Sequence, residues 1–237
     1  MNFLKKYIFV LSVIFSLVFA VSTEALVNKR TALGVSGNIF PTPTVFLPIV
    51  FDKQDRSLSC EVAALKMALA YHGVRVQEST LLKKVGFDTT AKKVVNGQKI
   101  WGDPNKGFVG DIDGKMPATG YGVYSDPITR AGKLYRPTYS IASWDLRSLS
   151  YELDQGNPII AWIYIGKGTA DSWKTPEGKR IQAVYNEHTV VVNGYTGSSE
   201  APTGFHVIDT LYGPQYYSAA DFLKRWRTLG RTGVVVN

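Results

Sequence analysis

The stretch SLSCEVAAL, residues 57–65, holds the only cysteine of the 237-residue chain, at position 60. A polar segment ends at this point, and apolar side chains then recur at helical spacing. The pattern predicts a helix from Cys60 to Tyr71, capped by the serine at 57 or 59. Partial positive charge and unpaired N–H groups at a helix N-terminus favour a thiolate over a thiol. Cys60 is therefore a candidate nucleophile.

A lone cysteine need not be a nucleophile. A free cysteine packs like a small hydrophobic residue, so Cys60 could be a buried filler. It could also join two chains through a disulfide. A nucleophile requires more, namely a histidine to take its proton and a carboxylate to orient that histidine.

Three histidines are available as the base. His72 ends the predicted helix about 18 Å of helical rise beyond the thiol, too far to reach it. His206 begins a strand, and His188 stands at the start of an apolar strand, where it could also be a packed or capping residue. If these two strands pair through the hairpin between them, Asp209 comes to lie beside His188 and His206 lies at the other end. Asp209 is otherwise a turn-forming residue.

An oxyanion formed by thiolate attack needs hydrogen-bond donors. Gln54, six residues before Cys60, carries an amide in the polar segment that precedes the helix. It is the candidate donor.

The order of elements indicates an α+β fold, with helices first and an antiparallel sheet afterwards. Residues 86–142 are rich in glycine and aromatic side chains without a sustained period, which predicts an ordered excursion or binding wall rather than regular structure. A packed insertion without function is the alternative. Besides the first helix we expect further helices at 78–85, at 144–155 between a cap at Ser143 and Gly156, and at 218–226, and strands at 159–165, 187–195, 205–210 and 233–236.

The chain begins with two lysines and an apolar run, the pattern of a secretory signal peptide, which we place at residues 1–25. An uncleaved membrane anchor is the alternative. Residues 26–44 read as an extended lead-in, and residues 45–237 as one domain. The formal charge is +8. Removing residues 1–25 takes away two lysines and one glutamate and leaves +7. An exported basic protein would be drawn to anionic wall polymers or lipid head groups, whereas no basic groove indicates nucleic acid.

Four ordered motifs resemble the C39-like peptidase family of the papain-like superfamily, in its exported Gram-positive form. They are Gln54, the SCEVAA of residues 59–64, the EHTVVVNGY of residues 187–195 and the VID of residues 207–209 with the segment that follows. The WGDPNKGFVG of residues 101–110 and the TGYGVY of residues 119–124 are similar as well. The resemblance covers residues 45–236.

The resemblance implies a papain-like fold with the nucleophile on an N-terminal helix. It also implies Cys60 as nucleophile, His188 as general base and then acid, Asp209 as orienter and Gln54 as oxyanion donor. The family pattern has glycine after the cysteine and proline after the aspartate, where this chain has Glu61 and Thr210. A charge at Glu61 would raise the pKa of the thiol slightly.

We therefore expect an exported cysteine peptidase that acts on a peptide or protein through an acyl-enzyme, with amide cleavage or transpeptidation as variants of the same chemistry. The alternative is a catalytically silent papain-like module that binds a wall polymer or peptide. The cysteine and histidines lack metal-ligand spacing, so we expect neither a metal nor a cofactor. We expect a monomer.

Overall fold

The computed structural model describes residues 40–237. The expected signal peptide at 1–25 lies outside the described residues, and so do residues 26–39 of the expected lead-in at 26–44. Within the described part, Pro41–Asn237 form one compact unit. None of the helices in residues 40–237 combines the length and the apolar character needed to cross a membrane.

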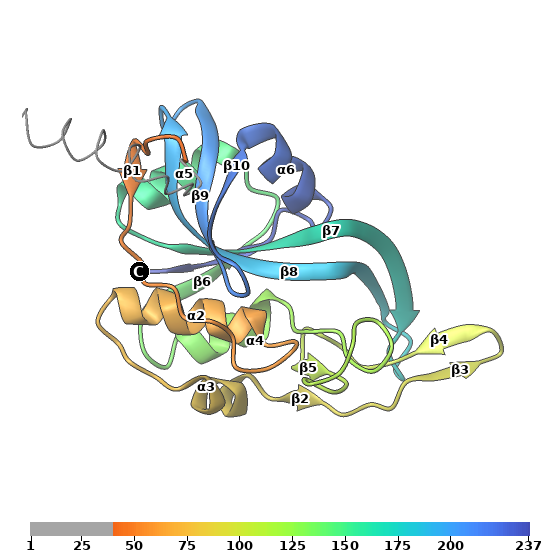
Figure 1. Ribbon diagram of the computed structural model, residues 1–237. Coiled ribbons are helices and arrows are strands. Elements are labelled where there is room, and N and C mark those ends of the chain that lie inside the picture. Colours follow the sequence, from red (N-terminus) through yellow and green to blue (C-terminus); the bar gives the residue numbers. More distant parts are fainter. Residues whose placement is uncertain (1–39) are drawn as a thin grey trace, which may run out of the picture. The chain divides into compact units, whose positions relative to one another are not determined.

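A sheet of nine strands organises the described unit (Figure 1). The strands on its main path are β6 (Thr138–Ile141), β7 (Ile159–Lys174), β8 (Arg180–Gly197), β9 (Pro202–Asp209), β10 (Gly213–Ser218) and β11 (Gly233–Val236). Their order is β10-β9-β8-β7-β11-β6, with antiparallel neighbours throughout. The short β1 (Val45–Phe46) pairs with the end of β8. The expected antiparallel sheet is confirmed.

The described residues form five helices: α2 (Cys60–Tyr71), α3 (Glu78–Val85), α4 (Ser125–Gly132), α5 (Leu146–Asp154) and α6 (Ala219–Arg227). Four of them contact the sheet directly, whereas α3 packs on α2 and α4. Figure 1 shows α2, α3 and α4 on one side of β7 and β8, and α5 and α6 on the other. Helix α2 contacts both β7 and β8. It is buried around most of its circumference because its side chains are small or apolar, so the sheet and the other helices approach it from several directions.

Residues 86–142 contain more regular structure than expected. Besides α4 and β6 they form the strands β2 (Phe87–Asp88), β3 (Lys93–Val95), β4 (Gln98–Ile100) and β5 (Phe108–Val109). These strands are too short to produce a recognisable period in the sequence. Strands β2 and β5 form a small parallel pair of their own, whereas β3 and β4 form a hairpin that joins the main sheet through β7.

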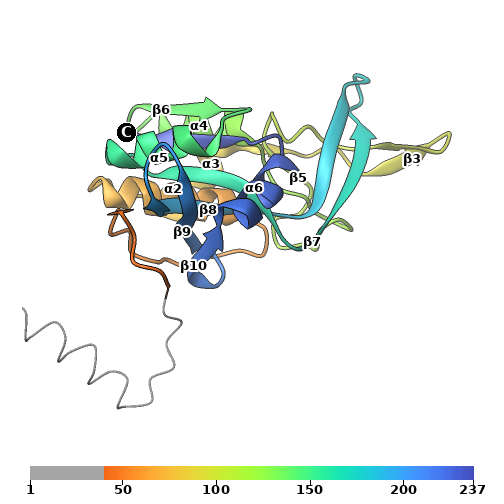
Figure 2. The ribbon, with the colours of Figure 1, turned by 90° about the horizontal axis from the view of Figure 1, so that it is seen from above.

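The second difference is the length of β7 and β8. Residues 166–186 were expected to be mostly loop, but β7 continues to Lys174 and β8 begins at Arg180. The two strands form a long arm, which Figure 2 shows extending away from the helices beside β3. Side chains of the arm pack with the excursion in a second apolar cluster, made of Trp101, Val109, Tyr121, Trp173, Ile181 and Ala183. The arm and the excursion therefore stabilise each other.

Candidate active site

Cys60 is the first residue of α2, as the sequence predicted, but the N-terminus is not capped as expected. The N-cap residue is Ser59, and its hydroxyl makes no cap hydrogen bond. It bonds instead to Glu78 on α3 and to the backbone of Arg56. Glu78 also accepts the N–H of Asp55 at 3.0 Å. These bonds hold the 52–59 loop against α3 and so set the position at which α2 begins.

His188 and Asp209 meet where β8 and β9 pair, at the end of β9 that precedes the turn to β10. Asp209 lies opposite Val190 in the register, two residues along β8 from His188. His188 Nε2 is 3.0 Å from Asp209 Oδ1, and both side chains are almost completely buried. The juxtaposition expected from the hairpin is therefore found. We call His188 and Asp209 the base end of the site.

Asp209 is well supplied with donors. Its Oδ1 accepts N–H groups from Leu211 and Tyr212 in addition to the contact with His188. Burial raises the pKa of the Asp209 carboxyl, but the hydrogen bond and charge of His188 and the two N–H groups lower it further, so the pKa lies below its ordinary value. Asp209 is thus suited to remain an anion beside the imidazole.

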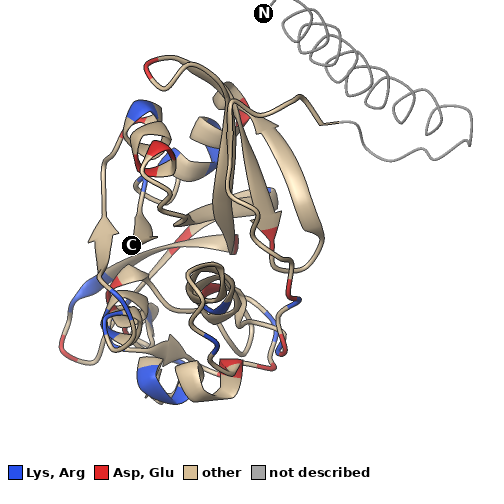
Figure 3. Ribbon diagram, turned by 90° about the vertical axis from the view of Figure 1, so that its left-hand side faces the viewer, with Lys and Arg blue, Asp and Glu red and all other residues tan. Residues whose placement is uncertain are grey.

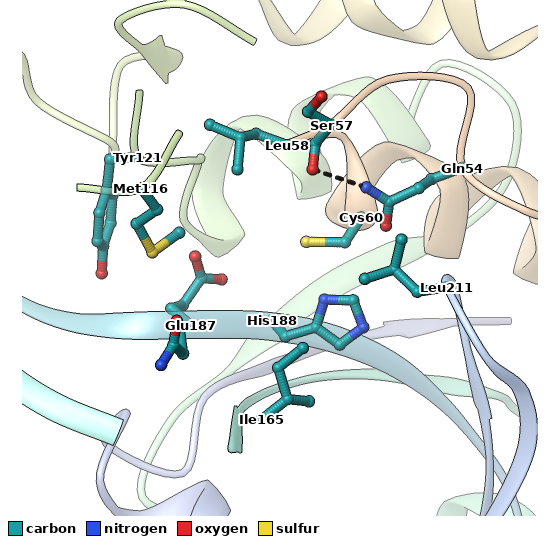
Figure 4. A pocket seen from close by; sticks show the side chains of 11 residues that line it. Gln54, Ser57, Leu58, Cys60, Met116, Tyr121, Ile165, Glu187, His188 and Leu211 are labelled. Carbon is teal, nitrogen blue, oxygen red and sulfur yellow. Dashed lines mark hydrogen bonds between the residues drawn. The ribbon is translucent and has the colours of Figure 1, made fainter. Parts of the chain in front are cut away.

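A cavity of about 140 Å³ is lined by both His188 and Cys60. Figure 4 shows His188, Cys60 and Gln54 around one part of this cavity, and Glu187, Met116 and Tyr121 around another. The Met116 and Tyr121 side chains come from the excursion, which therefore supplies part of the pocket wall. His72 and His206 do not line this cavity. His72 bonds to the carbonyl of Val236, at the far end of α2.

The Cys60 sulfur is directed away from His188. Its hydrogen bond is to Glu61 Oε2 at 3.4 Å, and Figure 4 shows the sulfur pointing toward the side of the pocket where Glu187 lies. Burial, the charge of Glu61 and the charge of Glu187 raise the pKa of the thiol well above its ordinary value, against a smaller opposing contribution from Thr189. The expected stabilisation of a thiolate is therefore not found in this arrangement, because burial and two nearby carboxyls favour the thiol.

Gln54 lies in the pocket, but its amide is occupied. Gln54 Nε2 donates to the carbonyls of Arg56 and Ser57 at 2.7 and 3.0 Å, and its Oε1 accepts the Thr210 hydroxyl at 2.8 Å. These bonds close the loop before α2 and link it to the turn after β9. An N–H of Gln54 becomes available to a ligand only when a loop carbonyl is released.

Glu61 and Glu187 form a second group of titratable side chains, which sequence reasoning did not bring together. Ligand atoms of Cys60, Glu61 and Glu187 all lie within 4.8 Å of one another, and the three residues are buried. Burial raises the pKa of the Glu61 carboxyl to about 7, and burial together with the charge of Glu61 raises the pKa of Glu187 well above its ordinary value. We call Glu61 and Glu187 the acid end of the site.

An irregularity in the sheet helps to place Glu187 and His188 in the same pocket. Successive residues of a regular strand point to opposite faces. Here the β7–β8 register shifts between Tyr164 and Thr169, next to Asn186, which has a φ of 61°. Such irregularities re-aim side chains, and asparagine tolerates this left-handed conformation better than most residues. The polar Asn186 before Glu187 was the only trace of this feature in the sequence.

Comparisons with known proteins agree with this architecture. A model of the Peptidase_C39 like family matches residues 46–234. The uncharacterized protein YvpB of Bacillus subtilis (strain 168) is 31% identical over 186 residues, which cover 75% of this chain and 68% of YvpB. A structure described as that of a C39-like peptidase from Bacillus anthracis superposes with a TM-score of 0.69 at 24% identity, covering 83% of this chain and 98% of that chain.

Proposed function

Because the chain belongs to the Peptidase_C39 like family and has the papain-like α+β fold, we propose that it is a cysteine peptidase with Cys60 as nucleophile. One observation carries the proposal. His188 Nε2 is hydrogen-bonded to Asp209, so the other ring nitrogen, Nδ1, can accept a proton in the pocket that also contains Cys60. A base held by a buried carboxylate next to a single thiol is the arrangement that acyl transfer requires.

In the proposed reaction the Cys60 side chain rotates from Glu61 toward His188, and Nδ1 accepts the thiol proton. The sulfur attacks the carbonyl carbon of the peptide bond and forms a tetrahedral oxyanion. The C–N bond then breaks as the imidazolium gives its proton to the departing amine, which leaves a thioester on Cys60. Water attacks this thioester, with His188 accepting its proton, and the release of the carboxylic acid returns the thiol.

Two donors would stabilise the oxyanion. The N–H of Cys60 belongs to the first turn of α2, where N–H groups have no partner within the helix. The second donor is Gln54, whose amide N–H groups would turn from the carbonyls of Arg56 and Ser57 toward the substrate. Each donor of this kind is worth about 10²-fold or more in turnover.

The test is cleavage of a complex peptide mixture by the purified protein, with new peptide ends read by mass spectrometry. We expect cleavage products with the unchanged protein and none with Cys60→Ala or His188→Ala. His72→Gln is the matched control, since His72 does not line the cavity, and it should cleave like the unchanged protein. Products that persist in Cys60→Ala would overturn the proposed nucleophile.

A second function, binding without catalysis, is favoured by one observation. The thiol is only 6% exposed, its pKa is raised and it bonds to Glu61 rather than to His188. In that case the pocket would hold a peptide or wall polymer without cleaving it. Cys60→Ala would then bind the same peptides with unchanged affinity, and neither form would generate new peptide ends.

We also propose that the protein is exported and acts at the cell surface, on the basis of residues 1–25 and the charge of +8. Figure 3 shows lysine and arginine positions on several separate elements, which suits loose attraction to an anionic wall polymer. Cosedimentation with purified cell walls should fall steeply as salt is raised. Binding that is indifferent to salt would contradict this attraction.

A further inference from the structure

The acid end contains one carboxyl that is satisfied and one that is not. Glu61 Oε1 accepts the N–H of Val123 at 2.8 Å, and its Oε2 accepts the thiol. Both oxygens of Glu187 are shielded from solvent, and no donor from residues 40–237 meets either of them. A carboxylate has room for about four hydrogen bonds, and leaving them unmade in the interior is costly.

The backbone is shaped to bring the two carboxyls close together. Gly122 has a φ of +148°, a conformation that favours glycine. A Cβ at this position would lie 2.6 Å from Glu61 Oε1 and 3.0 Å from Glu187 Oε2. Any other residue would therefore push the carboxyls apart. The close approach of two acidic groups is built into this segment of the excursion.

Glu187 nevertheless has no cationic partner among residues 40–237. Its raised pKa has burial and Glu61 as its causes, and no lysine, arginine or histidine of the described residues contributes. Glu187 is one of the residues that line the cavity, and its carboxyl points toward the side where the thiol lies (Figure 4). A positive group that enters the cavity would meet Glu187 directly.

The available atoms suit an ammonium group better than a metal ion. A protein-bound metal needs three or four ligand atoms released from other partners. Here both Glu61 oxygens already accept hydrogen bonds, so only Glu187 is free. An ammonium group needs acceptors alone, and it gains charge-assisted bonds to Glu187 without breaking those of Glu61.

We propose that Glu187 binds a primary ammonium group of the substrate, held close to the carbonyl that Cys60 attacks. This proposal rests on the proposed peptidase function and names its substrate class: peptides with a free amine near the bond to be cleaved, either the terminal α-amine or the amine of a short side chain. The separation of at most 4.8 Å between the thiol and the Glu187 carboxyl requires the amine to be near that bond.

Binding of the ammonium would also prepare the nucleophile. Burial holds the pKa of the thiol up, and the negative charges of Glu61 and Glu187 add to this effect. A cation bound between them and the sulfur offsets this field, so the thiolate forms more readily when the right substrate is present. Binding of the ammonium would then both select the substrate and activate the Cys60 thiol.

The test uses the single thiol and needs no peptide cleavage. Methanethiosulfonates react with a thiolate to form a protein–S–S–R disulfide and release methanesulfinate. The aminoethyl reagent carries an ammonium group, the propyl reagent is its neutral isostere and the sulfonatoethyl reagent is anionic. Rates at Cys60 are measured at about pH 8 with EDTA present, and each is divided by the rate of the same reagent with free mercaptoethanol.

We expect the normalised rate of the aminoethyl reagent to exceed that of the propyl reagent by about tenfold or more, and the sulfonatoethyl reagent to be slowest. Glu187→Gln should remove most of the difference in normalised rate among the three reagents. Glu200→Gln, which deletes an equal charge at an exposed residue paired with Arg147, should keep it.

Three results would overturn the proposal. The first is equal normalised rates for the three reagents in the unchanged protein. The second is a ranking of the reagents that survives Glu187→Gln or disappears in Glu200→Gln, and the third is a thiol that resists all three reagents because the pocket admits no ammonium. Failure of the peptidase proposal looks different. In that case no peptide is cleaved, whatever the order of the three reagents.

Discussion

The base end and the acid end of the pocket each contain one of two neighbouring residues of β8, His188 and Glu187, yet they differ in how their charges are satisfied. At the base end, Asp209 receives His188 and two N–H groups, and its pKa is lowered. At the acid end, Glu187 receives no donor from the described residues, and its pKa is raised. One end is complete as it stands, whereas the other lacks a positive partner.

This difference separates two kinds of buried charge. A carboxylate with several donors is a fixed part of the structure, and removing it leaves those donors unpaired. A carboxyl without donors adds little to the stability of the fold, and a ligand that binds to it is the better explanation for its presence. The two ends should therefore respond in opposite ways to substitution and to pH.

The largest effect should come from the base end. Asp209→Asn keeps the size of the side chain but replaces the anion that orients His188 and supports its charged form. We expect turnover of a cleaved peptide to fall by roughly a thousandfold or more, measured as kcat/KM. The control is Glu200→Gln, which should change turnover little. A variant of Asp209 that keeps more than a tenth of the activity would refute the role of this end.

The next effect concerns folding stability and pH. The folded protein holds protons on Glu61 and Glu187 at pH values where the unfolded chain has lost them. The stability linked to raised carboxyl pKa values is fully present below about pH 4 and is lost as pH rises. The loss from Glu61 is complete above about pH 7, and that from Glu187 continues higher.

Each of these groups contributes a slope of up to about 1.4 kcal/mol per pH unit while it titrates. Urea unfolding between pH 5 and pH 8 should show stability falling with pH in the unchanged protein and a flatter profile in a Glu61→Gln/Glu187→Gln double variant. Asp209 works in the opposite direction, because its lowered pKa removes stability only as pH falls into the acid range. Parallel profiles for the two proteins would show that the acid end does not titrate as described.

The smallest effect separates the two carboxyls of the acid end. Glu61→Met leaves the Val123 N–H unpaired and should destabilise the protein by about 1–3 kcal/mol. Glu187→Met removes a carboxyl without donors and should be neutral or stabilising by about 1 kcal/mol. Urea unfolding at about pH 6 measures both. Equal destabilisation by the two variants would mean that Glu187 has a partner within the fold.

Much of the fold could be predicted where elements are long and their period is clear. Helix α2 and helix α3 begin and end at the expected residues, and β11 does as well. The arm of β7 and β8 could not be predicted because its burial depends on a partner, the excursion, that has no period of its own. The turn signal of Pro176 and Gly178 marks the tip of the arm, but the flanking residues look too polar for strands. The sequence of β10 indicates a turn, and only its pairing with β9 makes it a strand.

The base end could be predicted because it depends on one hairpin, which brings the middle of β8, where His188 lies, beside the end of β9. The acid end could not. Glu61 is recognisable as a charge beside the thiol, but Glu187 joins it only through the packing of α2 on β8 and the irregularity at Asn186. Long-range packing of this kind leaves no local pattern in the sequence. The same packing overturned the expected thiolate, since burial of Cys60 is a property of the assembled fold.

The most direct test of the central claim is the alkylation of Cys60 by iodoacetamide between pH 5 and pH 9, followed in the unchanged protein, His188→Ala and Glu187→Gln. The account predicts opposite changes. Loss of the base should lower the rate below pH 7 by about tenfold or more, because the imidazolium favours the thiolate. Loss of the acidic neighbour should raise the rate toward the alkaline end of the range, where the carboxylate form of Glu187 opposes the thiolate. A rate profile that is the same with and without His188 would contradict the claim that Cys60 and His188 act together.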